Sequence, residues 1–367
     1  MVRQLKIFLV SNMYPDKNSP SYGIFVKNVE IGLSRQNILF PCKALIKGRS
    51  RNLIEKVFKY IKFYFQIIKD GLLCDYDLIY IHYPTHSIFP VCLVKFLRRK
   101  KVIANLHGSD VLKVNVVHRI LREATRPLFK KISLFIIPSE YFGEIVKEKY
   151  IALKNIVYVS PSGGIDNAVF FKKEKALARN KLNIPVDAFV VGYVSRIDKG
   201  KGWNVLLNAL KLVKDNKINI ICAIVGGGRD ESRMLRLIDE LELNDNVIYY
   251  GEQSQSNLPD YYNSFDVFVL PTINEESLGL VGLEALTCGV PIIASDIGGP
   301  KGYVEENING YLFLPGDHQQ LCQKIIHYSR LDPREKARIK KNCILSSRKY
   351  ERDTVMKNLG NELKNVQ

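Results

Sequence analysis

The chain has 367 residues, of which 46% are hydrophobic and 25% are charged, a composition typical of a globular protein large enough for two domains. Its net charge of +17 belongs to the first half: residues 1–181 carry 32 Lys+Arg against 13 Asp+Glu, and residues 182–367 carry 22 against 24. This asymmetry indicates an anionic partner, and the candidates are a membrane surface, a phosphorylated substrate and nucleic acid. No zinc-finger spacing, RNA-binding signature or basic-zipper pattern is present, which argues against nucleic acid.

Cysteine usage and the lack of long apolar runs bear on the compartment. The seven cysteines are dispersed, odd in number and without a C-x-x-C pair, which favours a reducing compartment over a disulfide framework or metal cluster. The apolar run at 5–10 is too short for a signal peptide, and no uncharged stretch approaches the roughly 20 residues that span a bilayer. We therefore expect a cytoplasmic protein, either free or peripheral on the inner face of the cytoplasmic membrane.

Short runs rich in Ile and Val alternate with helical patterns along the chain, which predicts two parallel α/β sheets, each covered on both faces. In the first half the predicted strands are residues 5–10, 77–82, 101–105 and 134–138, and a helix is expected over residues 24–33. In the second half the predicted strands are residues 189–194, 218–225, 247–250, 267–270 and 291–294. A turn cluster at 160–164 and a charged segment from 172 indicate the boundary, so we expect domains at 1–175 and 176–349.

The most informative stretch follows the predicted strand 267–270 and has the sequence E-S-L-G-L-V-G-L-E from Glu276 to Glu284. It places two carboxylates around a glycine-containing turn that opens an apolar helix. Free N–H groups at a helix start attract phosphate, and nearby carboxylates accept hydrogen bonds from sugar hydroxyls. The pattern favours a nucleotide-sugar site; the alternative is a helix that carries an acidic residue near its start because the dipole favours it.

The residues that follow resolve this choice. The stretch continues E-A-L-T-C-G-V-P-I-I-A-S from Glu284, then D-I-G-G from Asp296 and N-G-Y-L-F from Asn309. Together these motifs resemble the retaining GT-B glycosyltransferases of family 4, almost continuously in the second half and in patches in the first. The resemblance implies two Rossmann-like domains facing a central cleft, with a C-terminal helix at about 350–367 that crosses back to the first domain.

The resemblance also assigns roles around this stretch. Glu276 would contact the donor sugar and Glu284 the ribose, and the turn between them would bind the donor through Ser277, Leu278, Gly279, Leu280 and Val281. Gly226 and Gly227 follow another predicted strand and would shape the nucleotide site.

Two cations follow the predicted strand 189–194. Arg196 and Lys201 would face the crevice at the carboxyl end of a parallel sheet and stabilise the departing diphosphate. Family 4 has an Arg and a Lys-Gly at this spacing, which favours Lys201, and Lys199 is the alternative register. An isolated basic loop in solvent is the alternative explanation of the pattern.

In the first half, His107 and Asp110 form an H-G-S-D motif after the predicted strand 101–105. A lone histidine is more often structural, but the resemblance places His107 at the donor and Asp110 on the acceptor side. Gly23 precedes a predicted helix and would admit the donor phosphate. The family usually has a second glycine where Tyr22 stands, and often a glutamate where Gly302 stands, so the chain departs from the pattern at both positions.

Residues 53–69 are apolar, aromatic and basic together. At 100° per residue one stripe is formed by Ile54, Val57, Phe58, Ile61, Phe65 and Ile68, and the lysines at 56, 59 and 62 lie largely off it. The segment is either an interfacial helix on an anionic membrane or a sheet-covering helix with a solvated basic face. A basic cluster at 98–101 favours the membrane.

From these features we predict a retaining hexosyltransferase that moves a sugar from a nucleoside-diphosphate sugar, by resemblance a UDP-sugar, to a glycan or lipid-linked acceptor. The resemblance places it in the biosynthesis of a surface polysaccharide such as lipopolysaccharide or capsule. No cofactor or metal is expected, because no D-x-D ligand pair accompanies the predicted cleft and the cations would replace the metal. Two alternatives stay open, a sugar-nucleotide epimerase of the same fold and a non-catalytic, membrane-attached scaffold.

Overall fold

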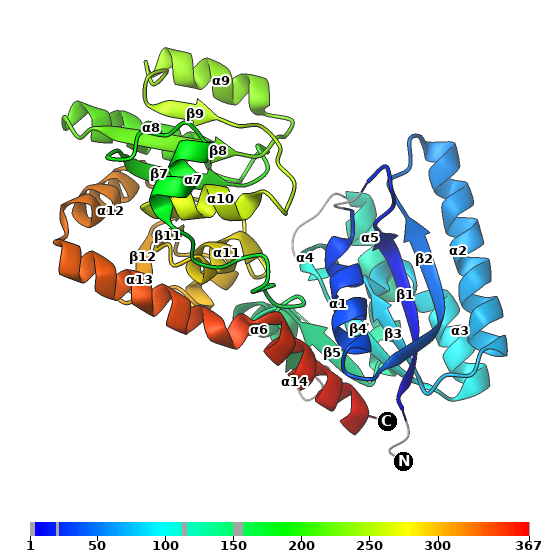
Figure 1. Ribbon diagram of the computed structural model, residues 1–367. Helices are drawn as coiled ribbons and strands as arrows, with labels where there is room; N and C mark the ends of the chain where they lie inside the picture. The colour runs from blue at the N-terminus through cyan, green and yellow to red at the C-terminus, as the bar shows by residue number, and fades with distance from the viewer. Residues whose placement is uncertain (1–3, 20–21, 112–115, 150–156, 367) are drawn as a thin grey trace. The chain divides into compact units, whose positions relative to one another are not determined.

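The computed structural model describes residues 4–19, 22–111, 116–149 and 157–366. It divides into two compact units, the first formed by residues 1–164 and 352–367 and the second by residues 165–351. Each unit is built on a six-stranded parallel sheet with helices on both faces (Figure 1). The predicted fold class, two Rossmann-like α/β units, is confirmed.

The sheet of the first unit has the order β2-β1-β3-β4-β5-β6. Its strands are β1 (Lys6–Tyr14), β2 (Leu39–Lys47), β3 (Leu78–His82), β4 (Lys101–Asn105), β5 (Leu134–Ile137) and β6 (Val157–Val159). Four of them match the predicted strands, whereas β2 and β6 were not predicted. Both are edge strands, and β2 contains Pro41 and two lysines, which a buried central strand would not tolerate.

Helices cover the two faces of this sheet. They are α1 (Ile24–Ser34), α2 (Leu53–Leu73), α3 (Ile88–Arg98), α4 (Gly108–Val111), α5 (Val116–Thr125), α6 (Glu140–Lys149) and α14 (Arg352–Asn365). One apolar core joins α2 and α3 to the sheet, and a second joins α1 and α14 to the opposite face. Short 3-10 turns lie at Pro84–His86 and Arg126–Lys131.

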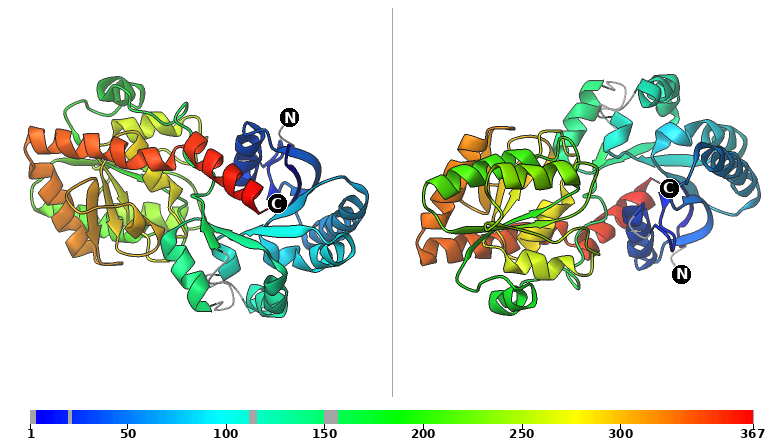
Figure 2. Two further views of the ribbon diagram at one scale, coloured as in Figure 1. Left: turned by 90° about the horizontal axis from the view of Figure 1, so that it is seen from below. Right: turned by 90° about the horizontal axis from the view of Figure 1, so that it is seen from above.

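The last helix belongs to the first unit, as expected. Met356 and Leu359 of α14 are fully buried in the core that α1 also lines. Helix α14 lies beside α1 (Figures 1 and 2). The two helices approach so closely that a Cβ on Gly32 would lie 2.3 Å from Met356 Cγ. Within the described ranges, no helix has both the length and the apolar composition needed to cross a bilayer.

The sheet of the second unit has the order β12-β11-β10-β7-β8-β9. Its strands are β7 (Phe189–Val194), β8 (Ile220–Val225), β9 (Val247–Tyr249), β10 (Val267–Leu270), β11 (Ile292–Ser295) and β12 (Gly310–Phe313). The helices are α7 (Lys175–Lys181), α8 (Trp203–Asp215), α9 (Glu231–Glu240), α10 (Leu258–Ser264), α11 (Leu280–Thr287), α12 (His318–Arg330) and α13 (Pro333–Ser347), with 3-10 turns at Gly299–Gly302 and Arg348–Tyr350. The five predicted strands are present, and only the edge strand β12 was not predicted.

The second unit begins earlier in the chain than the boundary expected after residue 175. Ile165 and Phe170 are buried in its core, and the backbone N–H of Lys173 donates to Asn263 Oδ1 at 2.6 Å. These contacts outweigh the turn-rich, charged composition that suggested a linker.

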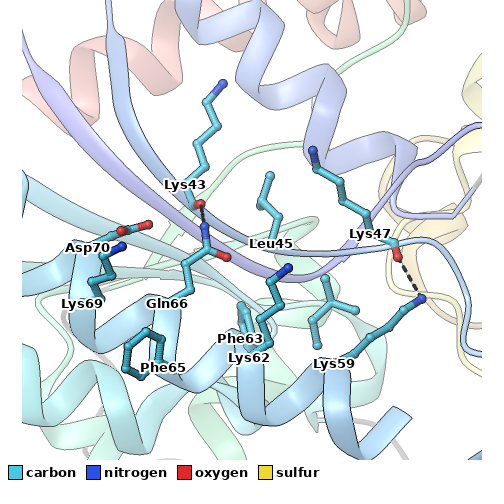
Figure 3. Close-up of a pocket in the computed structure, with 11 residues that line it drawn as sticks. Lys43, Leu45, Lys47, Lys59, Lys62, Phe63, Phe65, Gln66, Lys69 and Asp70 are labelled. Carbon is cyan, nitrogen blue, oxygen red and sulfur yellow. Dashed lines mark hydrogen bonds between the residues drawn. The ribbon is translucent and has the colours of Figure 1, made fainter. Parts of the chain in front are cut away.

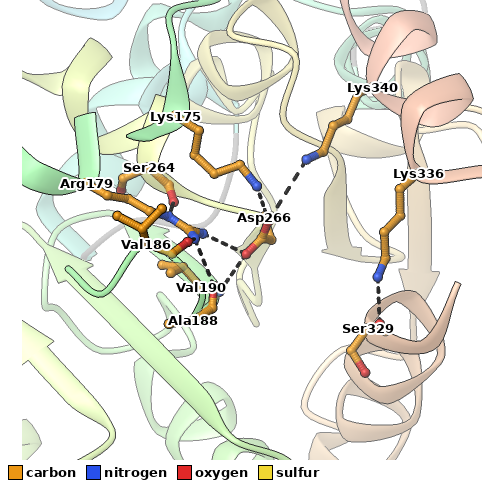
Figure 4. Close-up of polar contacts among 10 residues, drawn as sticks. All are labelled: Lys175, Arg179, Val186, Ala188, Val190, Ser264, Asp266, Ser329, Lys336 and Lys340. Carbon is orange, nitrogen blue, oxygen red and sulfur yellow. Dashed lines mark hydrogen bonds and ion pairs between the residues drawn. The ribbon is translucent and has the colours of Figure 1, made fainter. Parts of the chain in front are cut away.

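A buried ion pair closes the amino-terminal edge of the second sheet. Asp266, just before β10, accepts from the guanidinium of Arg179 at 2.7 Å and from the Val190 N–H of β7 at 2.8 Å (Figure 4). Arg179 is 2% exposed and donates further to the carbonyls of Ser264, Val186 and Ala188. This edge is therefore occupied by structural contacts, and the opposite, carboxyl edge is left for a ligand.

Candidate functional site

The strand order of the second unit creates a crevice at the carboxyl ends of β7 and β10. The first strand of the unit, β7, lies between β8 and β10, so the chain leaves these neighbouring strands in opposite directions. The two loops touch, because Ile273 N–H donates to the Gly200 carbonyl at 2.9 Å. Gly202 has φ +77°, and a Cβ there would lie 1.7 Å from the Pro271 oxygen, so only glycine fits between the loops.

This crevice brings together two of the predicted site residues. Lys201 Nζ, from the loop after β7, forms an ion pair with Glu276 Oε1, from the loop after β10. Both side chains are 22% exposed, which leaves the pair accessible to a ligand. Lys199 is exposed and forms no such pair among the described residues, so the structure favours Lys201 for the predicted register.

Arg196 does not join this pair. Its guanidinium is 71% exposed and forms an ion pair with Asp198 Oδ2 at 2.6 Å. The other Asp198 oxygen accepts from Arg229 N–H at 3.1 Å, which links the loop after β7 to the loop after β8. The Arg196 side chain thus lies exposed at the rim, whereas Lys201 is held at the crevice by its ion pair with Glu276.

The start of α11 lies beside the ion pair. Gly279 precedes the helix with φ +79°, and no side chain caps the first turn. Ser277, Leu280 and Val281 are partly exposed, while Leu278 is 3% exposed and packs into the core. The N–H groups of the first turn are therefore available for an anion, in the position that the sequence analysis assigned to the donor phosphate.

The loop after β11 packs against the backbone of Glu276. Gly299 N–H donates to the Glu276 carbonyl at 2.7 Å, and a Cβ on Gly298 would lie 2.7 Å from the Glu276 nitrogen. The buried Tyr303 hydroxyl donates to the Gly279 carbonyl at 2.8 Å. The backbone around Glu276 is thus fixed by the segment after β11, which the pairing of β10 with β11 brings beside it.

Glu284, the second carboxylate of the motif, is only 5% exposed. Its Oε2 accepts from the buried Tyr262 hydroxyl of α10 at 2.8 Å. Burial raises the pKa of Glu284 to about 7, and the hydrogen bonds from Tyr262 and Gln255 only partly offset that effect. The two carboxylates of the motif therefore differ: Glu276 pairs with a cation at the surface, and Glu284 lies behind the helix start.

Gly226 and Gly227 pack against the loop after β7. Gly226 has φ +129°, and a Cβ there would lie 1.9 Å from the Ser195 oxygen. The Gly227 carbonyl accepts from Ile197 N–H at 3.0 Å, and its own Cβ position is 3.5 Å from the nearest atom. Close backbone contact explains the glycine at 226, while 227 has room for a side chain.

In the first unit the corresponding crevice lies at β1, which separates β2 from β3. Gly23 precedes α1 with φ +70°, and a Cβ there would lie 2.6 Å from the Met13 carbonyl, so this position requires glycine. The Phe25 ring, in the first turn of α1, lies 4.8 Å from the His107 ring, and the Tyr83 ring lies 4.4 Å from it. The structure thus brings the Gly23 turn and His107 to one edge of the sheet. Asp110 falls in α4, but its side chain lies outside the described residues.

His107 has a partner, His82, on the neighbouring strand β3. His82 ends β3, is fully buried, and its Nδ1 lies 3.2 Å from His107 Nε2 with the rings stacked. The other His82 nitrogen, Nε2, is buried without a hydrogen-bond partner. Burying a ring nitrogen that carries no proton costs less free energy than burying an N–H group that has no acceptor. We therefore assign the proton between the two rings to His82 Nδ1. His107 then accepts at Nε2 and carries its own proton on Nδ1.

Both histidines are neutral. Burial lowers the pKa of His107 to about 3, and burial together with the facing His107 holds the pKa of His82 well below its usual value. His107 is consequently an uncharged N–H donor over the physiological pH range. The adjacency of β3 and β4, which the sequence alone could not reveal, creates this pair.

Comparison with known proteins identifies the kind of domain that the second unit carries. Residues 174–344 match the family model described as "Glycosyl transferases group 1", so the second unit carries a domain of that group. The D-inositol 3-phosphate glycosyltransferase of Mycobacterium tuberculosis (strain H37Rv) is 32% identical over 169 residues, which are 46% of this chain. The match covers 35% of the mycobacterial protein, so the chain aligns with only about a third of the length of these curated relatives.

Solved structures match the whole chain. Sucrose-phosphate synthase from Thermosynechococcus elongatus has a TM-score of 0.79 at 20% identity, covering 99% of both chains. Anabaena Alr3699/HepE in complex with UDP has a TM-score of 0.79 at 20% identity, covering 98% of this chain and 100% of that one. The lipopolysaccharide outer core galactosyltransferase WaaB has a TM-score of 0.71 at 15% identity, covering 99% of this chain and 100% of that one. These likenesses establish the fold, which is that of the GT-B glycosyltransferases.

Proposed function

We propose that this chain transfers a sugar from a nucleoside-diphosphate sugar to an acceptor hydroxyl. The observation that carries the proposal is the Lys201–Glu276 ion pair beside the uncapped start of α11, at the topological switch point of the group 1 domain. A cation and free N–H groups suit a diphosphate, and a carboxylate suits sugar hydroxyls. The three lie together where α/β sheets bind ligands.

The arrangement assigns a role to each group in the second unit. The first-turn N–H groups of α11, from Gly279 to Val281, bind the diphosphate, and Lys201 exchanges Glu276 for a phosphate oxygen when the donor arrives. Glu276, once released, accepts hydrogen bonds from the donor sugar. Arg196 closes over the leaving group from the rim, and Glu284 receives the ribose hydroxyls by exchanging its bond from Tyr262.

In the first unit, His107 donates a neutral N–H bond to the donor sugar or its phosphate, and Asp110 is assigned to the acceptor by resemblance. The Gly23 turn leaves room at the start of α1 for the phosphate. A neutral donor stabilises developing negative charge without losing its proton to the reaction, so His107 acts through hydrogen bonding and not as an acid.

We propose retention of configuration and independence of metal. Glu276, once released from Lys201, accepts hydrogen bonds from the sugar hydroxyls, so in this proposal it is not the nucleophile of a double displacement. The departing diphosphate accepts the proton of the acceptor on the same face of the sugar, and the cations stabilise it in the place of a metal. Product NMR should give the anomeric configuration of the donor, and EDTA should leave the rate unchanged.

The substrates follow from the relatives. A structural neighbour was solved with UDP and with UDP-glucose, which supports a uridine donor, and WaaB acts in lipopolysaccharide synthesis, which supports a glycan or lipid-linked acceptor. We place the reaction in surface-polysaccharide biosynthesis, at the inner face of the cytoplasmic membrane. The excess positive charge of residues 1–181 supports that location.

The test is thermal stabilisation by a panel of nucleoside diphosphates and their sugars, followed by transfer assays with the donor that binds. A ligand at 100 times its dissociation constant adds about 2.7 kcal/mol to the free energy of unfolding. Stabilisation by one nucleotide class and transfer to an acceptor support the proposal. Isomerised free nucleotide-sugar in the absence of acceptor would instead identify an epimerase, and stabilisation by none would leave the scaffold alternative.

A further inference from the structure

Helix α2 has apolar side chains on two opposite faces. Phe63 and Ile67 are buried against the sheet, as in any sheet-covering helix. The stripe that the sequence pattern singled out faces the other way, and its exposed members are Ile54 (69%), Val57 (50%), Phe58 (67%), Ile61 (61%) and Phe65 (67%). The two alternatives for this helix are therefore not exclusive, because it packs on the sheet with one face and presents a second apolar face to solvent.

Helix α3 extends this exposed face. It packs beside α2 on the same side of the sheet, and its outer side chains Phe89, Leu93, Phe96 and Leu97 are 47% to 80% exposed (Figure 1). The two adjacent helices thus present nine large apolar side chains in the first unit. Large apolar side chains exposed in this number on adjacent helices are typical of an interaction site.

A basic pocket borders the apolar face. It has a volume of about 630 Å³ and lies between α2 and the outer edge of β2, the edge strand of the sheet (Figure 3). Two side chains of α2 cover the strand's carbonyls: Gln66 donates to Lys43 at 2.8 Å and Lys59 donates to Lys47 at 3.1 Å. The edge is thereby protected from pairing with another strand.

The remaining cations of the pocket are available. Lys62, whose side chain rises from α2 toward β2 in Figure 3, and Lys69 form no ion pair within the described residues. They are seven positions apart, so they share one face of the helix, next to the face that carries Phe58 and Phe65. Asp70 is the one acidic side chain among those that line the pocket. Unpaired cations therefore lie one helical stripe away from exposed aromatic rings.

We infer that the outer faces of α2 and α3 are a docking surface for a membrane of anionic phospholipids, and that the pocket between α2 and β2 seats the lipid phosphate. The apolar side chains enter the acyl boundary while Lys62 and Lys69 contact headgroups. Charge complementarity selects this occupant, since the same half of the chain holds all the excess positive charge. This inference rests on the proposed function in one respect, namely that the proposed function places the protein at a membrane.

The experiment is co-sedimentation of the full chain with vesicles of phosphatidylcholine alone and with added phosphatidylglycerol. Wild type should partition onto the anionic vesicles. Lys62→Gln with Lys69→Gln should lower that partition roughly thirtyfold, because each cation contributes about 1 kcal/mol and a tenfold change corresponds to about 1.36 kcal/mol. Phe58→Ser with Phe65→Ser should lower binding without changing the preference for anionic lipid.

The matched control is Lys341→Gln with Lys357→Gln, an equal change of charge at exposed lysines on α13 and α14, which should partition like wild type. Equal binding of wild type to both kinds of vesicle, or wild-type binding by the Lys62/Lys69 variant, would overturn the inference. Full displacement of the protein from the vesicles by soluble glycerol phosphate would also overturn it and would identify a free phosphate ligand. Self-association of the chain through the Phe58/Phe65 face would overturn it as well. Stabilisation by nucleotides is measured on the same variants and should persist, so failure of vesicle binding and failure of the transferase proposal are separate results.

Discussion

Replacing Glu284 by glutamine should stabilise the protein at neutral pH while weakening nucleotide binding. The carboxyl is buried, and its pKa of about 7 in the folded protein compares with an ordinary value of 4.5. A raised pKa means that the folded state holds the proton more tightly than the unfolded chain does. The contribution of Glu284 to stability is therefore fully present below about pH 4.5 and is lost as the pH rises through about 7.

The size of the effect follows from that difference in pKa. At about 1.36 kcal/mol per pH unit, the free energy of unfolding should fall by about 2 to 3 kcal/mol between pH 5 and pH 8 because of this one group. Glutamine has the same shape and does not titrate, and its Oε1 can still accept from Tyr262. Any pH-independent cost of the unpaired amide hydrogens cancels when the two pH values are compared.

Urea unfolding followed by tryptophan fluorescence measures this directly. The single tryptophan, Trp203, is buried in the unit that contains Glu284, so its signal reports the relevant transition. Glu240→Gln, at an exposed position of α9, removes the same charge but keeps Glu284, so its stability should depend on pH as that of wild type does. A stability difference between Glu284→Gln and wild type that is the same at both pH values would refute the burial argument. Undiminished stabilisation by nucleotide would refute the ribose role.

Three further predictions concern single residues. Lys201→Ala should lower kcat about 10²- to 10³-fold, because a charge-stabilising group on the leaving diphosphate is lost, whereas Lys199→Ala should stay near wild type in steady-state transfer assays. Gly279→Ala should lower the free energy of unfolding in urea by about 1 to 2 kcal/mol, because φ at this position is +79°. Gly302→Ala, whose added methyl group meets open space, should change it by less than about 0.5 kcal/mol. Equal losses in the two variants would contradict the backbone strain assigned to Gly279. The Cε1–H resonance of His107 should not titrate in NMR spectra between about pH 5 and pH 8, since its pKa is lowered to about 3, and a midpoint near 6.5 would show that the histidine pair is solvated.

Much of the fold was accessible from the sequence because strands buried on both faces must be apolar throughout. The runs that became β1, β3, β4 and β5, and β7, β8, β10 and β11, were identified for this reason, and the partly buried edge strand β9 was identified as well. The strands that escaped prediction, β2, β6 and β12, lie at sheet edges, where one side is open and the apolar requirement is relaxed. Glu276, the glycine before α11 and the helix itself were likewise readable, because a turn and a helix start are local events.

The pairings that give these residues their chemistry depend on strand order. Lys201 meets Glu276 because β10 is inserted beside β7, and His82 meets His107 because β3 adjoins β4; neither adjacency is encoded in local sequence. Burial raises the pKa of Glu284, and its carboxylate accepts a hydrogen bond from Tyr262 of α10, a helix outside the motif. On α2 the amino acids determined two apolar faces, but only the packing against the sheet decided that Phe63 and Ile67 are covered while Phe58 and Phe65 face solvent. Periodicity fixes which side chains share a face, whereas the tertiary structure decides what each face meets.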